Sequence, residues 1–345
     1  MSKAGTMKAI VFQDTGKFVY TDRPVPEISR PDDVKFRILA ASICGSDVQM
    51  LADPPGHIAT KGIILGHECV GEVVETGMAV HSLKPGDKVI FDNNLTCGIC
   101  PACKSGHSNM CANMESMGSM TDGIFCEYAV APARAFEKIP MNTDIRKAVL
   151  AEPMTMVLSA VKKLRVVPGC TCAVLGGGPL GMMFARFLKM RGAGKVILSE
   201  VSPFRSSFAA ANGVDVTVNP MKDDLEQIVL SETEQMGADI VVDAVGSLMG
   251  DAVAIARPAG TVMLFGMNAK AHTDLAQYQI TMKDLTVLGN YIAVNTLGDV
   301  ANLLKHDQAD FSGLITHELP LKDFGTGLAA IRNGEAMKVV LYPEQ

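Results

Sequence analysis

The segment Gly176-Gly-Gly178-Pro179-Leu180-Gly181 constrains the fold of this chain more than any other feature. It directly follows the apolar run Cys172–Leu175 and opens a stretch with helical spacing, Leu180 to Arg191. Glycines at this spacing allow a tight turn, close approach of the backbone to a pyrophosphate, and close packing of the helix on the strand. The amide groups at the helix start then face the phosphates. The pattern predicts a dinucleotide site at Gly176, Gly178, Pro179, Leu180 and Gly181.

Two charged residues bear on which dinucleotide binds there. Glu200 ends the next predicted strand, Lys195–Ser199, nineteen residues after Gly181. A carboxylate at this position binds the ribose hydroxyls and repels a 2′-phosphate. Arg205 is a cation that could accept such a phosphate, but we expect it to lie against the adenine. The sequence therefore predicts NAD rather than NADP, and we also assign Val245, Phe265 and Gly266 to the cofactor site.

The segments that surround this motif predict two domains in the 345 residues. From about residue 170, strands and helices alternate, which is typical of a parallel sheet with helices on both faces. Residues 7 to 150 contain short strands broken by proline and glycine, as in an all-β barrel-like module. A helix is expected over Pro153–Leu164. The tail should contain two further helices and a final strand: Leu297–Lys305, Phe324–Asn333 and Ala336–Leu341.

Four cysteines lie within fifteen residues of a polar loop. They are Cys97, Cys100, Cys103 and Cys111. This spacing is typical of a closed tetrahedral thiolate site for zinc. Two disulfides are the alternative, but nine cysteines in the chain would leave one unpaired. The N-terminus also shows no signal-peptide pattern. We therefore predict structural zinc in a reduced protein.

A second set of metal-binding residue types is scattered along the chain. Cys44 precedes Ser46, His67 and Glu68 are adjacent, and Glu152 lies much later. A thiolate, an imidazole and a carboxylate suit a zinc ion that keeps one position open. Zinc with an open position can lower the pKa of a bound alcohol. Because Ser46 is two residues from Cys44, it could pass the alcohol proton outward while NAD takes a hydride.

Composition limits the partners of this protein. The net charge is −6 without a basic run, which argues against nucleic acid or an anionic membrane as the main partner. No uninterrupted apolar stretch is long enough to span a bilayer. We expect a cytoplasmic enzyme that acts on a small molecule.

Together, these motifs resemble those of the zinc-dependent medium-chain alcohol dehydrogenases, in particular the sorbitol (polyol) and threonine dehydrogenase branch. The resemblance covers nearly the whole chain. It rests on Cys44-Gly-Ser-Asp47, Gly66-His-Glu68, the cysteine lobe, Ala151-Glu152-Pro153 and the glycine motif. It implies a GroES-like β-barrel catalytic domain from residues 1–154 and 290–345, with a structural zinc lobe at 93–114. A Rossmann doubly wound domain, 155–289, would be inserted between them, and the protein would be a homotetramer or homodimer.

The resemblance also assigns roles to individual residues. It implies that Cys44 and His67 bind the catalytic zinc, and that Glu68, Glu152 or both can bind it. Simple ethanol-type enzymes have a cysteine or aspartate at the position of Glu152, so this chain differs from them. Asp47 would steady the histidine ligand.

Two departures from the branch pattern bear on the substrate. Gln49 stands where the branch usually has a histidine of the proton relay, and Ile292 stands near the position of a substrate-binding arginine of sorbitol enzymes. Sorbitol itself is therefore disfavoured. The predicted reaction is oxidation of a secondary alcohol on a polyol, polyol phosphate or related sugar derivative. The alternatives are L-threonine 3-dehydrogenase, against which Gln49 counts, and a non-catalytic dinucleotide-binding relative.

Overall fold

The computed structural model describes residues 5–344, so the outermost residues of the predicted domain ranges lie outside the described part. The chain separates into two compact units, Met1–Thr155 with Val294–Gln345, and Met156–Ala293. Each unit has its own hydrophobic core. None of the helices in the described residues combines the length and the apolar character that a bilayer crossing needs.

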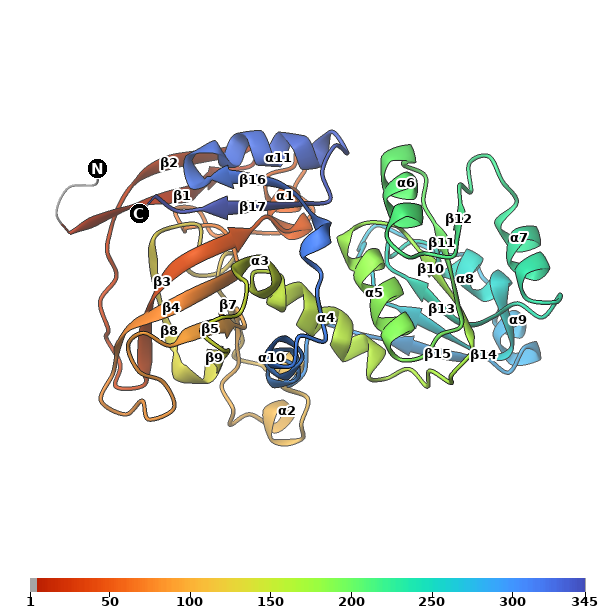
Figure 1. Cartoon of the computed structure of the whole chain (residues 1–345), viewed down its shortest axis with the longest axis horizontal. Helices are drawn as coiled ribbons and strands as arrows, with labels where there is room; N and C mark the ends of the chain where they lie inside the picture. The colour runs from red at the N-terminus through yellow and green to blue at the C-terminus, as the bar shows by residue number, and fades with distance from the viewer. Residues whose placement is uncertain (1–4, 345) are drawn as a thin grey trace. The chain divides into compact units, whose positions relative to one another are not determined.

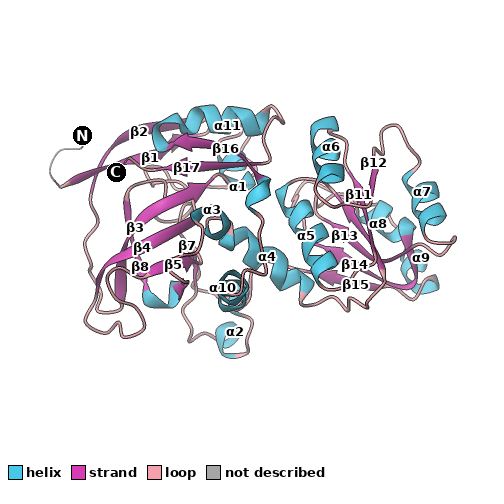
Figure 2. Cartoon of the chain, in the orientation of Figure 1, coloured by secondary structure: helices cyan, strands magenta, loops and turns pink. Residues whose placement is uncertain are grey.

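The first unit is built mainly of β-strands (Figures 1 and 2). Its strands are β1 Thr6–Asp14, β2 Lys17–Pro24, β3 Asp33–Ser42, β4 Glu68–Thr76, β5 Lys88–Phe91, β6 Asn94–Leu95, β7 Glu115–Ser116, β8 Tyr128–Pro132, β9 Phe136–Lys138, β16 Ile315–Pro320 and β17 Lys338–Tyr342. Its helices are α1 Gly45–Met50, α2 Pro101–Lys104, α3 Ile145–Ala148, the N-terminal part of α4 Ala151–Val161, α10 Leu297–Lys305 and α11 Phe324–Arg332.

The main sheet of this unit joins both ends of the chain. Its strand order is β16-β17-β3-β4-β5-β9, with β8 also paired to β3. The C-terminal strand β17 pairs with β3 so that Val340 is opposite Ser42, and Ser42 is opposite Glu68 on β4. Three phenylalanines of this sheet, Phe36, Phe91 and Phe136, pack ring against ring in the hydrophobic core. Residues from distant parts of the sequence therefore meet at the ends of β3, β4 and β17.

The second unit is a parallel α/β domain. Its strands are β10 Thr171–Leu175, β11 Lys195–Ser199, β12 Val216–Val218, β13 Ala238–Asp243, β14 Ala256–Leu264 and β15 Thr286–Gly289. Its helices are α5 Pro179–Met190, α6 Pro203–Ala211, α7 Leu225–Glu232, α8 Met249–Ile255 and α9 Gln277–Met282, together with the C-terminal part of α4. The sheet order is β12-β11-β10-β13-β14-β15, and every pairing is parallel. Helices α5 and α6 lie on one side of the sheet and α7, α8 and α9 on the other (Figure 1).

This order is that of a doubly wound dinucleotide-binding sheet, so the predicted fold class is confirmed. The chain reverses its winding direction between β10 and β13, where ligands bind in such sheets. One predicted boundary differs from the structure in a way that matters. Helix α4 begins at Ala151, two residues before the expected Pro153, because Pro153 fits the first turn, where no amide partner is needed. Glu152 therefore lies inside the first turn of a helix.

Candidate functional site

Three of the predicted metal ligands come together in the first unit. Cys44, His67 and Glu68 each offer one ligand atom, and these atoms lie within 4.8 Å of one another. Cys44 is the N-cap of α1, and Glu68 is the first residue of β4. A soft thiolate, an imidazole and a carboxylate form a zinc donor set, and three protein ligands leave a fourth position free.

The imidazole of His67 is oriented by residues of α1. Its Nδ1 lies 3.7 Å from Oδ1 of Asp47, and the other carboxylate oxygen of Asp47 accepts the amide hydrogen of Cys44 at 2.9 Å. Its Nε2 lies 3.3 Å from the hydroxyl oxygen of Ser46. A carboxylate behind one ring nitrogen is the usual means of aiming the other at a metal. Asp47 thus holds Cys44 and His67 in one arrangement.

Glu68 is paired with Lys338, a residue that the sequence analysis missed. Lys338 is the first residue of β17 and is only 3% exposed. Its ammonium group donates to Oε2 of Glu68 and to the carbonyl of Ile43 at 3.3 Å, and the Ser42 hydroxyl donates to the same Oε2. Oε1 of Glu68 is buried without a hydrogen-bond partner in the described chain, as expected of an oxygen that faces a cation.

The lysine could have been noticed in the sequence. It precedes Val-Val-Leu in the last strand, and a lysine among buried residues needs a negative partner. Which carboxylate pairs with it depends on the pairing of β17 with β3, and of β3 with β4, which sequence periodicity does not give.

Burial and neighbouring charges shift the pKa values of the ionisable groups at this site. Burial raises the pKa of the Cys44 thiol to about 12, and the nearby Glu68 charge adds to the effect. Burial also raises the pKa of Glu152, and Glu68 and Cys44 contribute. Burial acts to lower the pKa of His67, but the carboxylates of Asp47, Glu152 and Glu68 outweigh it and raise that pKa. Glu152 therefore lies within electrostatic range of the cluster, although it is outside the 4.8 Å set. This donor chemistry fits Zn²⁺.

The four predicted structural cysteines also converge. Their sulfur atoms lie within 4.8 Å of one another, with separations of 3.5 Å from Cys100 to Cys103, 4.0 Å from Cys100 to Cys111 and 3.5 Å from Cys111 to Cys97. Tetrahedral zinc with bonds of about 2.3 Å spaces its sulfurs by about 3.8 Å. Backbone amides of Ile99 and Cys100 donate to the Cys97 sulfur and lower its pKa to about 6. The spacing of the four sulfurs is therefore close to that of a four-thiolate zinc site.

The glycine motif of the second unit forms the turn between β10 and α5. A Cβ on Gly181 would collide with the carbonyl oxygen of Gly176, so only glycine permits this approach. Glu200 is buried at the end of β11, where its carboxylate accepts the amide hydrogens of Gly177 at 2.7 Å and Ser202 at 2.8 Å. These two bonds fix the carboxylate against the glycine turn, where ribose hydroxyls bind in this fold.

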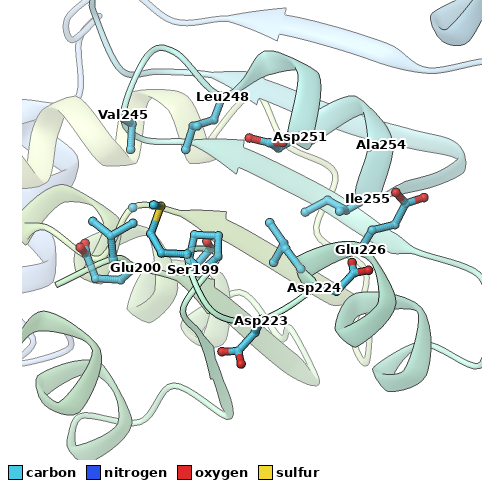
Figure 3. Close-up of a pocket in the computed structure, with 15 residues that line it drawn as sticks. Ser199, Glu200, Asp223, Asp224, Glu226, Val245, Leu248, Asp251, Ala254 and Ile255 are labelled. Carbon is cyan, nitrogen blue, oxygen red and sulfur yellow. The ribbon is translucent and has the colours of Figure 1, made fainter. Parts of the chain in front are cut away.

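A cavity of about 630 Å³ opens beside this turn (Figure 3). Gly176 and Glu200 are among its lining residues, and Val201, Val245 and Leu248 supply apolar walls. Four more carboxylates line it, those of Asp223, Asp224, Glu226 and Asp251. The described residues that line the cavity include no lysine, arginine or histidine. Its shape and apolar walls suit an adenosine, and its charge is unfavourable to an added phosphate.

The other residues assigned to the cofactor site have different surroundings. Arg205 is not among the residues that line the cavity, and one of its terminal nitrogens lies 3.8 Å from the position that a Cβ on Gly178 would take. Its Nε is buried without a partner in the described chain. Phe265 packs edge-on against Phe184, with ring centroids 4.8 Å apart.

Gly266 lies in the turn after β14. Its amide donates to the carbonyl of Asp243 at 2.9 Å. The side chain of Asp243 was also missed by the sequence analysis, and it accepts the amides of Val245, Gly246 and Leu248 at 2.7–2.9 Å. Asp243 therefore shapes the loop that forms one wall of the cavity.

Known protein families match residues in both units. The alcohol dehydrogenase GroES-like domain matches residues 30–141, and the zinc-binding dehydrogenase domain matches residues 179–306. Sorbitol dehydrogenase of Bacillus subtilis (strain 168) is 28% identical over 98% of both chains. L-Threonine 3-dehydrogenase of the same strain is 32% identical over 99% of this chain and 100% of that one.

A solved structure is similar over the same extent. It is a zinc-binding dehydrogenase from Sinorhizobium meliloti 1021 bound to NADP, with 28% identity and a TM-score of 0.92, and the match covers 98% of this chain and 99% of that one. The domain matches and the full-length relatives agree with the metal-binding residue types and the dinucleotide fold described above. The chain belongs to the family of zinc-dependent medium-chain alcohol dehydrogenases, enzymes that use zinc and a nicotinamide dinucleotide.

Proposed function

We propose that this enzyme uses NAD to oxidise a secondary alcohol of a polyol, a polyol phosphate or a related sugar derivative to the ketone. The observation that carries the proposal is the cluster of Cys44, His67 and Glu68, of which His67 and Glu68 are buried, with Glu152 in electrostatic range. A glutamate at position 152 matches the polyol and threonine branch rather than the simple ethanol-type enzymes. The relatives named sorbitol and L-threonine dehydrogenase support the same branch.

In this proposal one unit carries the catalytic site and the other binds NAD. Residues 1–155 and 294–345 form the catalytic domain, and residues 156–293 form the NAD-binding domain. Cys44, His67 and Glu68 hold the catalytic zinc, with Glu152 as a further carboxylate. Cys97, Cys100, Cys103 and Cys111 hold the structural zinc. When bound, the catalytic zinc makes an alcohol more acidic, and NAD takes up a hydride.

Two residues of α1, Asp47 and Ser46, act on the His67 ring and on the alcohol proton. Asp47 fixes the His67 ring, and the Ser46 hydroxyl beside Nε2 accepts the proton that the alcohol releases. A bound NAD would take a hydride from the carbon, and the hydroxyl would release a separate proton, so the alcohol would give up two electrons and two protons in all. Gln49, one helical turn beyond Ser46, has no titratable group, so the proton leaves by another group or by water.

Electrostatics supports NAD rather than NADP as the cofactor. Glu200 is held at the glycine turn, and the adjoining cavity has five carboxylates and no cation among its described lining residues. A 2′-phosphate in this cavity would meet carboxylates and no cation among the described lining residues, since Arg205 lies near Gly178 but does not line the cavity. The NADP-bound relative makes this preference worth measuring directly.

L-Threonine 3-dehydrogenase is the second candidate, favoured by relatives 32–33% identical to this chain. The residue at position 49 argues against it, because this chain has Gln49 where that branch usually has histidine.

The proposal is tested by NADH formation with purified protein, using free polyols, polyol phosphates and L-threonine, with and without a zinc chelator. We expect chelator-sensitive activity on a polyol or its phosphate. Cys44→Ser should abolish that activity but retain NAD binding, whereas Cys170→Ser serves as the control cysteine substitution in the other unit. Activity on L-threonine alone would favour the second candidate, and no activity with zinc and NAD bound would refute the polyol assignment.

A further inference from the structure

Two cysteines outside both predicted zinc sites lie in contact with each other. The sulfur atoms of Cys170 and Cys172 are 3.7 Å apart. Cys170 immediately precedes β10, and Cys172 is the second residue of that strand. Among the described residues, neither sulfur belongs to a metal-type cluster, and neither residue lines the cofactor cavity. A disulfide brings two sulfurs to about 2.0 Å, so a shortening of about 1.7 Å would join this pair.

Cys172 is held inside the parallel sheet. Its strand β10 lies between β11 and β13, and Cys172 takes part in the pairing on both sides. Its side chain is 0% exposed. The amide of the preceding residue, Thr171, donates to the carboxylate of Asp239 at 2.8 Å, which fixes the start of the strand. The closing of the sulfur gap therefore depends on movement of Cys170.

Cys170 lies in a turn and not in the sheet. Its amide donates to the carbonyl of Val167 at 3.0 Å, and its own carbonyl accepts the amide of Gly194 at 2.9 Å. The residue is half-buried, so solvent reaches part of it. Because β10 begins only at Thr171, the side chain of Cys170 can turn toward Cys172 without breaking the pairing of the strand.

The two thiols differ in their access to a reagent. Burial raises the pKa of the Cys172 thiol, and the neighbouring Cys170 adds to the rise. A buried, protonated thiol reacts slowly with an oxidant, whereas redox-sensitive cysteines are accessible and lie next to a second thiol. We therefore expect Cys170 to meet the oxidant first and Cys172 to act as the second, resolving thiol.

The other two cysteines outside the metal-type clusters provide a contrast. Cys69 and Cys126 are 1% and 0% exposed, and burial raises the pKa of both thiols. An oxidant in solution reaches neither of them in the folded protein. Contact between two sulfurs, together with solvent access to one of them, thus distinguishes Cys170 and Cys172.

We propose that Cys170 and Cys172 form a reversible disulfide when the enzyme meets hydrogen peroxide, so that this turn is a redox-sensitive site of the cofactor-binding unit. The Cys170 sulfur attacks the peroxide: an S–O bond forms, the O–O bond breaks, and water leaves. The Cys172 sulfur then displaces this oxygen: the S–S bond forms, the S–O bond breaks, and the Cys172 proton leaves with the oxygen as a second water. The two thiols lose two electrons and two protons, and the peroxide is reduced. A dithiol restores both thiols by exchange and becomes a disulfide itself.

The disulfide would lie at the end of β10 away from the glycine turn. Strand β10 runs from Thr171 to Leu175, and Gly176 follows. Cys172 and Gly176 are four residues apart along an extended strand, which is a distance of about 13 Å. We therefore expect the oxidised enzyme to retain NADH binding, and this binding reports that its fold is intact.

The first test is mass analysis of the zinc-loaded, full-length enzyme after titration with hydrogen peroxide. The protein is denatured, alkylated with iodoacetamide and cleaved with trypsin. Residues 166–186 form one tryptic peptide, whose two cysteines are Cys170 and Cys172. We expect this peptide to lose the mass of two hydrogens and to take up no alkyl group. Dithiothreitol added before alkylation should restore two alkyl groups, and the peptide that contains Cys69 should remain alkylated throughout.

Zinc content and NADH affinity are measured on the same samples. If both thiols persist at the peroxide dose that releases zinc, or if Cys170 is oxidised beyond the sulfenic acid without a disulfide, the inference is overturned. A disulfide found only in protein that has lost NADH binding would belong to an unfolded chain and would overturn it as well.

The second test separates the roles of the two thiols. Cys172→Ser should accumulate a sulfenic acid at Cys170, which dimedone labels. Cys170→Ser should be labelled at least about tenfold less at position 172, because that thiol is buried and protonated. If either variant proves unfolded by NADH affinity and unfolding midpoint, the wild-type enzyme is labelled at limiting peroxide, and the label should lie on Cys170. Equal labelling of the variants, or label on Cys172 of the wild type, would contradict the assigned order.

Discussion

Lys338 and Glu68 form a buried ion pair between residues 270 positions apart, which joins the C-terminal strand to the first residue of β4. Burial acts to lower the pKa of Lys338, but the Glu68 carboxylate outweighs it and raises that pKa, and Lys338 in turn lowers the pKa of Glu68. The pair holds one oxygen of Glu68, and the other is buried without a hydrogen-bond partner among the described residues.

Lys338→Met should destabilise the enzyme strongly. Removing one partner leaves the Glu68 charge buried and uncompensated, which costs about 3–5 kcal/mol of unfolding free energy. Urea unfolding of the metal-free protein, in which no bound cation compensates the Glu68 charge, measures the loss. The double variant Lys338→Met/Glu68→Gln should recover part of it, and Lys322→Met, which removes an exposed partner of Glu344, should have little effect. An unchanged free energy in Lys338→Met would mean that Glu68 is already neutral in the folded protein.

Cys97→Ser should remove one zinc ion from each chain. Three sulfurs bind zinc less tightly than four, and a structural site contributes directly to folding. We expect zinc analysis to fall from about two ions per chain to about one, with a lower unfolding temperature but intact NAD binding. The comparison protein is Cys170→Ser, which should keep both ions. A Cys97→Ser protein with undiminished zinc would show that the lobe binds no metal.

Glu200→Gln should weaken the preference for NAD over NADP. The amide still occupies the space but no longer repels a 2′-phosphate, and it accepts the ribose hydroxyls less strongly. The KM for NAD should rise about tenfold and that for NADP should fall. Glu232→Gln, which alters an exposed pair with Lys195 in the same unit, is the matched control. Equal shifts in both KM values would indicate that Glu200 only stabilises the glycine turn.

Asp87→Asn should flatten the acid dependence of stability. Burial acts to raise the pKa of Asp87, but the Lys138 ammonium 2.5 Å away and the Lys84 amide lower it below its usual 3.8. A carboxyl group with a depressed folded-state pKa contributes its full stabilisation above its unfolded value, and loses it as the pH falls through the folded value.

Urea unfolding of wild type and Asp87→Asn at several pH values tests this. The wild type should be more stable by about 2 kcal/mol at pH 7. The difference should persist down to about pH 4 and then decrease. A difference that grows as the pH falls would contradict the assignment of a stabilising carboxylate.

Local motifs in the sequence predicted a large part of this protein. The turn at Gly176–Gly181, the strand before it and the helix after it are set by neighbours in sequence, and helix Leu297–Lys305 was predicted with its bounds. The four cysteines of the lobe are close in sequence, so their convergence needs only a loop. That Cys44, His67 and Glu68 contribute to one zinc site was predicted first from their residue types and then from the family resemblance.

The contacts between residues far apart in the sequence follow from the folded arrangement of the strands. Sequence periodicity indicates that a residue of a strand is buried, but not which strand lies beside it. The register of β17, β3 and β4 brings Lys338 to Glu68, and the pairing of β6 with β7 brings Ser116 to Asn94. The sequence thus determined the chemistry available to this enzyme, because ligand types and glycine turns are local properties. Sheet pairing between the two ends of the chain decided the charge and polarity around that chemistry, because electrostatic contacts depend on distance in space.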